Sequence, residues 1–290
     1  MLGYLSQYPD ERGQTHQGTL VVTKQIDNLL GCPDKVNGDM VIANMGISSL
    51  EGSPKEVTGS FYCSENKLKT LKNGPKKVGK DYICNGNKLK DLDGVADSVV
   101  NFNCRNNEIR TLKGSPTNVL GDFICSQNML NDLVGIPKII KGDLYCNGNM
   151  LTTLIGGADE VRADFNCGDN NLTSLEGSPK VSNDYKCAGN KQLKSLKGIQ
   201  QIIYGDLIAH SCGLETLEFA PKEIRGTFEC QWNNIKNFKE EVIKHQVKAI
   251  SYTSDDGGFD FKDIKEEFEA EQTKQRVNSK GFRAMLGLKK

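Results

Sequence analysis

The chain has 290 residues, of which 37% are apolar and 7% aromatic, and it includes 30 Gly, 8 Pro and one Trp. This composition favours a turn-rich chain with a narrow core of aliphatic side chains. Its 37 Lys and Arg balance its 37 Asp and Glu, which excludes the overall positive charge of a general nucleic-acid or anionic-membrane binder. We expect a soluble protein that does not use the usual export route, because no segment reads as a membrane span or signal peptide.

From residue 18 to residue 238 the sequence repeats with a period of 20 to 22 residues, and residues 1–17 are expected to cap its first turn. The runs from Gly59, Gly121 and Gly142 share the template G-D-F-x-C-x-x-N-x-L-x-x-L-x-G-x-P-x-x-V. Such a period predicts a solenoid of about eleven turns. The Cys position of the template is filled by Val22, Ile42, Cys63, Cys84, Cys104, Cys125, Cys146, Cys167, Cys187, Ala209 and Cys230.

Each repeat is expected to begin with a short strand, because a large apolar residue stands two positions before the Cys position and this alternation buries one face. Two aliphatic residues, five and eight positions after it, fill the return half. Proline in that half forbids a long helix, so the convex side is expected to be extended or 3₁₀. The fold class predicted is mainly β, with short C-terminal helices.

Asn recurs three residues after the Cys position, where its amide can bond backbone groups freed at the end of the strand. A stacked Asn ladder is therefore expected. Gln25, Met45 and Cys212 replace this Asn, and Gln192 adds one residue to the ninth repeat. We expect irregular ladder positions in these places.

The template resembles the leucine-rich-repeat signature L-x-x-L-x-L-x-x-N-x-L, and its L-x-G-x-P continuation is similar to the short repeats of bacterial type III effectors. Strings such as SLEGSPKEV and NKLKTLKNGPKKV resemble still more the leucine-rich-repeat-like proteins of tailed phages. Over residues 18–238 the resemblance implies a non-enzymatic interaction or structural module that is encoded by a phage and is a head or tail component of the virion. The alternative is a host-directed effector or anti-defence protein in the bacterial cytoplasm that binds a host protein.

The ten Cys are interpreted as reduced, buried core residues. Equivalent residues on neighbouring turns stack about 4.8 Å apart, which is longer than the Cβ distance of about 3.8 Å that a disulfide prefers. No C-x-x-C pair occurs, so neither a metal site nor a cofactor is expected. Cys32 and Cys212 lie off this ladder and are expected to be more exposed.

A file of Asp residues precedes the strands, three positions before the Cys position. The file suggests cation binding, but a Gly-Asp pair that turns the chain into the strand is the simpler interpretation, with the carboxylate accepting a local backbone N–H. We favour the structural role. The file contains Asp39, Asp81, Asp122, Asp143, Asp164, Asp184 and Asp206.

The residue between the two buried strand positions faces outward from the concave sheet. Exposed apolar side chains there predict a surface for a protein partner. The alternatives are that β propensity alone selects these residues or that an N-terminal segment covers them. The predicted contact residues are Val41, Tyr62, Ile83, Ile124, Tyr145 and Ile208.

Catalytic signals are weak in this sequence. The three His, namely His16, His210 and His245, are scattered, and no nucleophile elbow, phosphate loop or H-E-x-x-H occurs. Effectors that are ubiquitin ligases carry a large catalytic domain after their repeats, for which the last 50 or so residues leave no room. No enzymatic activity and no catalytic residues are therefore predicted.

After the repeats, residues 239–253 are expected to form a capping helix, 254–258 a linker, and 259–290 an amphipathic helix with a basic tail. This tail is a candidate attachment peptide. The alternatives are a disordered tail, or a strap that folds back on the solenoid. Nucleic-acid binding through the tail is a further alternative that we do not favour, and no membrane contact is predicted. The attachment residues are Phe282, Arg283, Met285, Leu286 and Leu288.

Overall fold

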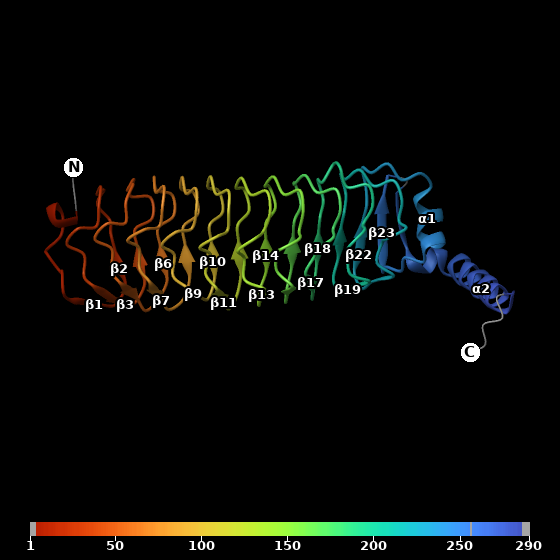
Figure 1. Cartoon of the computed structure of the whole chain (residues 1–290), viewed down its shortest axis with the longest axis horizontal. Coiled ribbons are helices and arrows are strands. Elements are labelled where there is room, and N and C mark those ends of the chain that lie inside the picture. The colour runs from red at the N-terminus through yellow and green to blue at the C-terminus, as the bar shows by residue number, and fades with distance from the viewer. Residues whose placement is uncertain (1–3, 256, 286–290) are drawn as a thin grey trace.

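The computed structural model describes residues 4–255 and 257–285, without the side chains of residues 6 and 278–285. It confirms a mainly β solenoid of about eleven turns followed by two helices (Figure 1). We number the turns by the strand that each contributes to one long sheet, the main row. The main row contains β2 (Leu20–Val21), β4 (Met40–Val41), β6 (Phe61–Tyr62), β8 (Tyr82–Ile83), β10 (Phe102–Asn103), β12 (Phe123–Ile124), β14 (Leu144–Tyr145), β16 (Phe165–Asn166), β18 (Tyr185–Lys186), β20 (Leu207–Ile208) and β22 (Thr227–Glu229).

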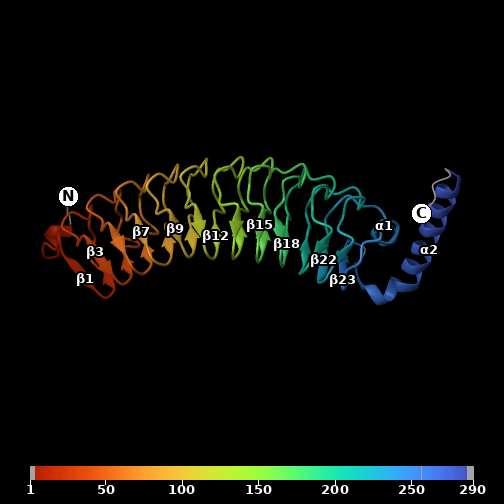
Figure 2. The same ribbon diagram turned by 60° about the horizontal axis from the view of Figure 1, so that its bottom comes forward.

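The strands of the main row are parallel and in register, so equivalent residues of successive turns lie side by side, as Phe61, Tyr82 and Phe102 do. Figure 2 shows the array bowed into an arc, with the strands along its inner side and the loops along its outer side. The predicted strand at the start of each repeat is therefore confirmed, and it lies on the concave face.

A second row of short parallel strands lies at the end of each repeat, just before the Gly-Asp corner. These strands are the extended part of the return half, whose other described residues form turns, bends and irregular segments. In the described chain the only 3₁₀ helix is η1 (Tyr4–Ser6), which lies outside the repeats. The second row contains β1 (Thr15–Gln17), β3 (Lys35–Asn37), β5 (Glu56–Val57), β7 (Lys77–Val78), β9 (Ser98–Val99), β11 (Asn118–Val119), β13 (Ile139–Ile140), β15 (Glu160–Val161), β17 (Lys180–Val181), β19 (Ile202–Ile203) and β21 (Glu223–Ile224).

Each turn contributes one layer of side chains to the core, and the equivalent side chains of successive turns stack in columns along the solenoid. Phe61 and Tyr82 pack edge to face with ring centroids 5.2 Å apart, as do Phe165 and Tyr185. All ten cysteines are free and buried, as predicted for the eight that belong to the ladder. The expectation that Cys32 and Cys212 are more exposed is wrong, since the exposed fractions are 2% and 7%.

The N-terminal segment and the tenth turn explain why these two thiols are buried. The segment at Tyr4 covers the first turn, where the Tyr4 N–H donates to Asn28 O at 3.1 Å, and so encloses Cys32. In the tenth turn Cys212 occupies the position of the ladder Asn, and its Sγ donates to Cys187 O at 3.3 Å.

The predicted Asn ladder forms and joins successive turns. Asn87 is representative: its Nδ2 donates to Cys63 O and Cys84 O at 3.0 Å each, and its Oδ1 accepts the Leu68 N–H at 3.1 Å. Each amide therefore ties its own strand end to the preceding turn. The insertion at Gln192 breaks this pattern locally, because the Leu193 N–H bonds to Asn190 O of its own turn.

The C-terminal part differs from expectation. The helix predicted over 239–253 is the eight-residue α1 (Phe238–His245). The described residues of the linker predicted over 254–258 lie in or beside a β-hairpin of β23 (Ser251–Ser254) and β24 (Gly257–Asp260). β23 extends the main row by pairing with β22. The reason is that Tyr252 lies in register with Phe228 and is fully buried, so the core continues for one more strand.

The chain then enters α2 (Phe261–Met285), which projects from the end of the solenoid (Figures 1 and 2). Ile264 and Phe268 are buried, in agreement with the predicted apolar stripe. Of the predicted attachment residues, Phe282, Arg283 and Met285 belong to the last turns of α2, where side chains are not described, and Leu286 and Leu288 lie outside the described residues. None of the described helices is long and apolar enough to span a bilayer.

Candidate binding surface on the concave sheet

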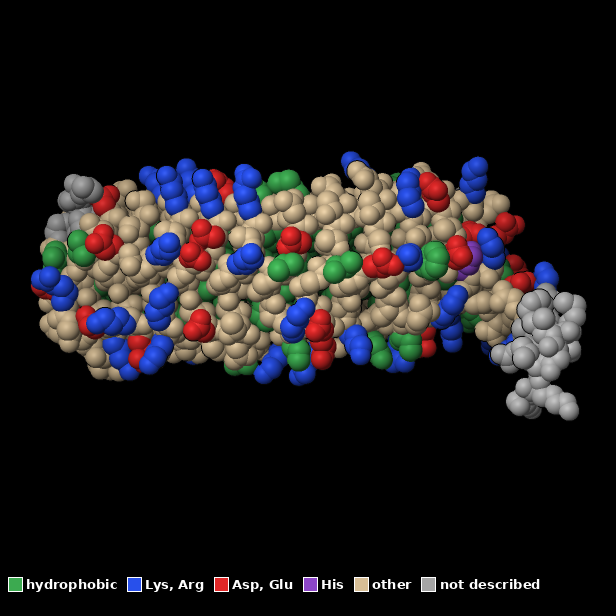
Figure 3. All heavy atoms as spheres, viewed as in Figure 1, with side chains coloured by type: hydrophobic (Ala, Val, Ile, Leu, Met, Phe, Trp, Pro, Cys, Tyr) green, Lys and Arg blue, Asp and Glu red, His purple; other side chains and the backbone are tan. Residues whose placement is uncertain are grey.

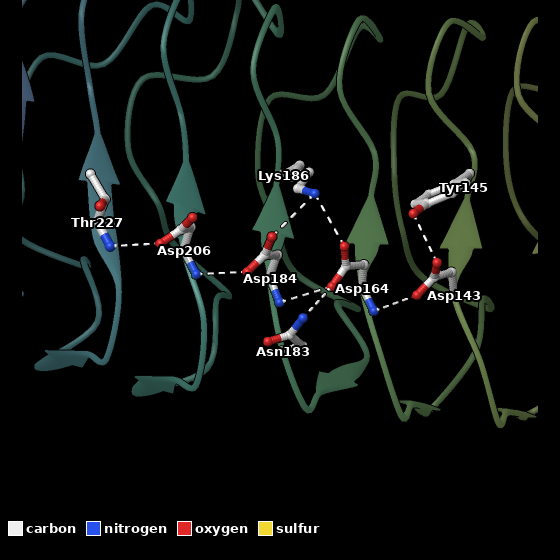
Figure 4. Close-up of polar contacts among 8 residues, drawn as sticks. All are labelled: Asp143, Tyr145, Asp164, Asn183, Asp184, Lys186, Asp206 and Thr227. Carbon is white, nitrogen blue, oxygen red and sulfur yellow. Dashed lines mark hydrogen bonds and ion pairs between the residues drawn. The ribbon is translucent and has the colours of Figure 1, made fainter.

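The Asp file forms a hydrogen-bonded ladder along one edge of the main row (Figure 4). Oδ1 of Asp143 accepts the backbone N–H of Asp164 at 2.9 Å, and Oδ1 of Asp206 accepts that of Thr227 at 2.7 Å. Asn101 does the same without charge, accepting the Asp122 N–H at 2.8 Å. The carboxylates thus have the structural role that we favoured, except that each bonds the next turn rather than its own.

The second carboxylate oxygens face side chains of the concave surface. Tyr145 donates its hydroxyl proton to Asp143 Oδ2 at 2.8 Å, and Lys186 Nζ lies 3.1 Å from Asp164 Oδ2 and 3.2 Å from Asp184 Oδ2 (Figure 4). Partial burial and the bond to Asp143 raise the pKa of Tyr145. Over the described residues, no three His, Cys, Asp or Glu side chains are grouped so that they could hold a metal ion.

The outward residues of the main row, one per turn, form a continuous column that we call the concave row. The structure brings Val41, Tyr62 and Ile83 together on adjacent strands, and places Ile124 beside Tyr145. Ile208 is separate, between Lys186 and Glu229. The full row is Val21, Val41, Tyr62, Ile83, Asn103, Ile124, Tyr145, Asn166, Lys186, Ile208 and Glu229.

Exposure along the concave row is intermediate, except at Val21, which is 49% exposed. Neighbours in register shield one another, so each side chain presents its outer part to solvent. The described N-terminal residues, from Tyr4 onward, reach the end of the first strand, where the Tyr8 hydroxyl accepts the Thr23 N–H at 2.9 Å. These residues do not cover the row, and in the described structure its apolar part is an accessible strip.

Trp232 is a surface feature that was not predicted from the sequence. It is 69% exposed, its backbone has φ of 56°, and its ring lies edge-on to His210 at 5.7 Å. The same position, two residues after the Cys position, has a positive φ in nine other turns, where it is occupied by glycine in three and by Asn, Glu, Gln, Asp or Ser in six. The signal was available in the sequence: the only Trp occupies a position held in these turns by glycine or a polar residue.

The three histidines lie far apart in the part of the chain that the structure describes. His16 and His245 lie near opposite ends of the described chain, and His210 Nδ1 is 3.2 Å from Ser211 Oγ of the neighbouring residue. Burial raises the pKa of the ladder thiols, to about 12 for Cys125, so they stay protonated near neutral pH. The accessible chemistry of this surface is therefore aromatic, aliphatic and hydrogen-bonding contact.

Comparison with known proteins adds no relative: no protein-family model matches the chain, and neither a curated protein nor a solved structure is significantly similar to it.

Proposed function

We propose that this protein is a non-enzymatic scaffold that binds a protein partner on its concave sheet. The main observation behind this proposal is an apolar strip that faces outward, although nothing in the turn requires apolar groups there. The strip consists of Val41, Tyr62 and Ile83 and is continued by Ile124 and Tyr145. β propensity favours Val, Ile and Tyr in strands as well, but it does not explain an exposed Trp in a turn.

Trp232 gives independent support for this proposal. The left-handed backbone at this position belongs to the repeat, and in the other turns that adopt it the position holds glycine or a polar residue such as Asn106 or Ser211. Trp232 therefore departs from the repeat by its exposed ring, and exposed Trp and Tyr are the side chains that most often dominate the energy of protein interfaces. The proposed surface therefore runs from the apolar strip to Trp232.

The repeat template supports a more specific proposal about the kind of partner. Its resemblance to leucine-rich-repeat-like phage proteins supports a phage-encoded component of the virion head or tail, in which the concave sheet contacts another virion protein. The test is mass spectrometry of purified particles of the encoding phage. The protein should be present at a fixed ratio to the major structural proteins, and particles without it would contradict the virion role.

A second candidate is a host-directed protein in the bacterial cytoplasm, favoured by the Tyr and Trp anchors that suit capture of a foreign protein. The test is affinity capture from host lysate with the wild type and with a Tyr62→Ser/Tyr145→Ser variant. Ile155→Ser is the matched control, because Ile155 is 62% exposed and lies outside the concave row. Loss of one host protein in the double variant alone would support this role, and equal capture by all three would contradict it.

A further inference from the structure

Five cations gather on the edge where the chain leaves the main row, in turns three to five. Two outward positions there flank the buried residue that comes five positions after the Cys position. They hold Lys67 and Lys69, then Lys88 and Lys90, then Glu108 and Arg110. Figure 3 shows Lys and Arg side chains collected along one edge over the turns drawn orange and yellow in Figure 1. We call Lys67, Lys69, Lys88, Lys90 and Arg110 the basic edge.

Backbone hydrogen bonds hold these positions in register from turn to turn. The Lys88 N–H donates to Leu68 O at 2.9 Å, and the Arg110 N–H donates to Lys90 O at 3.3 Å. Lys69, Lys90 and Arg110 are thus stacked in one column, at a spacing of about 4.8 Å per turn. All five side chains of the basic edge are exposed.

Other turns show that this arrangement is not required by the fold. In turns six to eight the same two positions carry only uncharged residues. In turns nine and ten the second position holds Lys194 opposite Glu215, and the two form an ion pair of 2.9 Å. The uncharged residues are Met129, Asn131, Met150, Thr152, Asn171 and Thr173.

Within the described part of the chain, no member of the basic edge forms an ion pair. Four acids lie within three residues of the basic edge in sequence. Glu108 stands in the first column and Glu65 precedes Lys67 by two residues, while Oδ1 of Asp91 accepts the Asp93 N–H at 3.1 Å and Asp93 pairs with Lys72 outside the edge at 3.7 Å. Like charges in register on neighbouring strands repel. The basic edge thus destabilises the solenoid slightly and keeps its cations free for an external anion.

We propose that the basic edge binds the phosphate backbone of double-stranded nucleic acid, independently of the protein partner on the concave sheet. Two columns about 6.6 Å apart, over three turns of about 4.8 Å, form a compact grid of positive charge. Lys and Arg contacts to phosphates are independent of sequence. Single-strand binders add aromatic stacking platforms, and the described positions of this grid hold no aromatic residue.

The zero net charge of the whole chain does not oppose this proposal. Charges farther apart than the Debye length, about 8–10 Å in physiological salt, are largely screened. A phosphate on the basic edge therefore senses the local cations more than distant carboxylates. Binding of this kind is expected to be weak and to depend steeply on salt.

The test measures binding of a fluorescent 20-base-pair DNA duplex by anisotropy between 50 and 200 mM salt. Five phosphate contacts predict a slope of log K against log salt of about −4.5. The variant Lys69→Asn/Lys90→Thr/Arg110→Thr uses residue types that this column already holds in turns six to eight. It should keep the fold, checked by circular dichroism, and make the slope shallower by about 3.

The control variant Lys138→Asn/Lys194→Asn/Lys197→Asn removes the same charge from residues that form ion pairs elsewhere and should leave the slope unchanged. No duplex binding at 50 mM salt, or equal loss in both variants, would overturn the proposal. Tighter binding to a single-stranded oligonucleotide, or binding to phosphatidylserine vesicles without duplex binding, would also overturn it.

Discussion

Oε2 of Glu241 accepts the backbone N–H of Leu217 at 3.0 Å, and the Thr216 hydroxyl at the same distance. In the eighth turn the equivalent N–H, that of Leu175, donates at 2.8 Å to a backbone carbonyl of the next turn, Lys197 O, whereas turns three to seven make no such backbone bond. At the end of the solenoid the Glu241 carboxylate, which lies in the first turn of α1, is the acceptor. This bond makes α1 a cap.

This bond predicts a pH-dependent contribution to stability. Partial burial raises the pKa of Glu241, but Lys244, the Leu217 N–H and the Thr216 hydroxyl outweigh it and lower the pKa to about 2, from 4.5. A carboxyl with a lowered folded-state pKa stabilises the fold above its unfolded pKa and loses this effect as the pH falls. The Glu241 contribution should be complete above pH 5 and decline between pH 4.5 and 2.

The measurement is urea unfolding of the wild type and Glu241→Gln at pH 7, 5, 4 and 3. At pH 7 the variant should be less stable by about 1–2 kcal/mol, and the difference should shrink at pH 4 and below. Glu266→Gln, at an exposed position of α2, is the control and should show little change. A difference that stays constant with pH would contradict the capping role.

The Asp ladder makes a separate prediction at Asp164, which receives the Asp184 N–H at 3.3 Å, Asn183 Nδ2 at 2.7 Å and Lys186 Nζ at 3.1 Å. Asp164→Ala leaves these donors without their acceptor and should cost about 2–3 kcal/mol of unfolding free energy. Asp164→Asn keeps an acceptor oxygen and should cost about 1 kcal/mol. Equal losses in chemical denaturation would show that the ladder acts through charge alone.

Trp232→Gly tests whether this residue is retained for binding rather than for folding. Glycine removes the strain of the left-handed backbone, although it increases the entropy of the unfolded chain. The variant should gain about 0.5–1 kcal/mol in unfolding free energy while losing affinity for the partner. Trp232→Phe, which keeps the left-handed backbone, should gain nothing, and a large destabilisation by Trp232→Gly would show that Trp232 stabilises the fold.

The repeating part of the fold followed from the sequence, because each column of the solenoid repeats the same chemical requirement. Where the template ends, that reasoning failed. Gly257 and Gly258 suggested a linker, yet they begin the edge strand of a hairpin. Tyr252 was not recognised as a core residue, because it stands outside the Cys template although Ser251, Tyr252 and Thr253 repeat the alternation of β22.

Surface features were harder to predict than core features. The sequence identified Tyr62 and Tyr145 as outward residues, but their intermediate exposure depends on shielding by neighbours in the arc. The strain at Trp232 required its backbone angle. The basic edge was not predicted, because the chain as a whole has no net charge. It becomes apparent only in the structure, which places Lys69, Lys90 and Arg110 in one column.

The central claim is that the concave sheet is the partner-binding face, and site-specific photocrosslinking tests it most directly. A photoreactive phenylalanine replaces Tyr62, Tyr145 or Ile155 in separate proteins, which are irradiated in extracts of the cells that produce the protein. The same discrete adduct should form from positions 62 and 145 and not from position 155, which lies outside the concave row. An adduct confined to position 155, or none at 62 and 145, would contradict the claim.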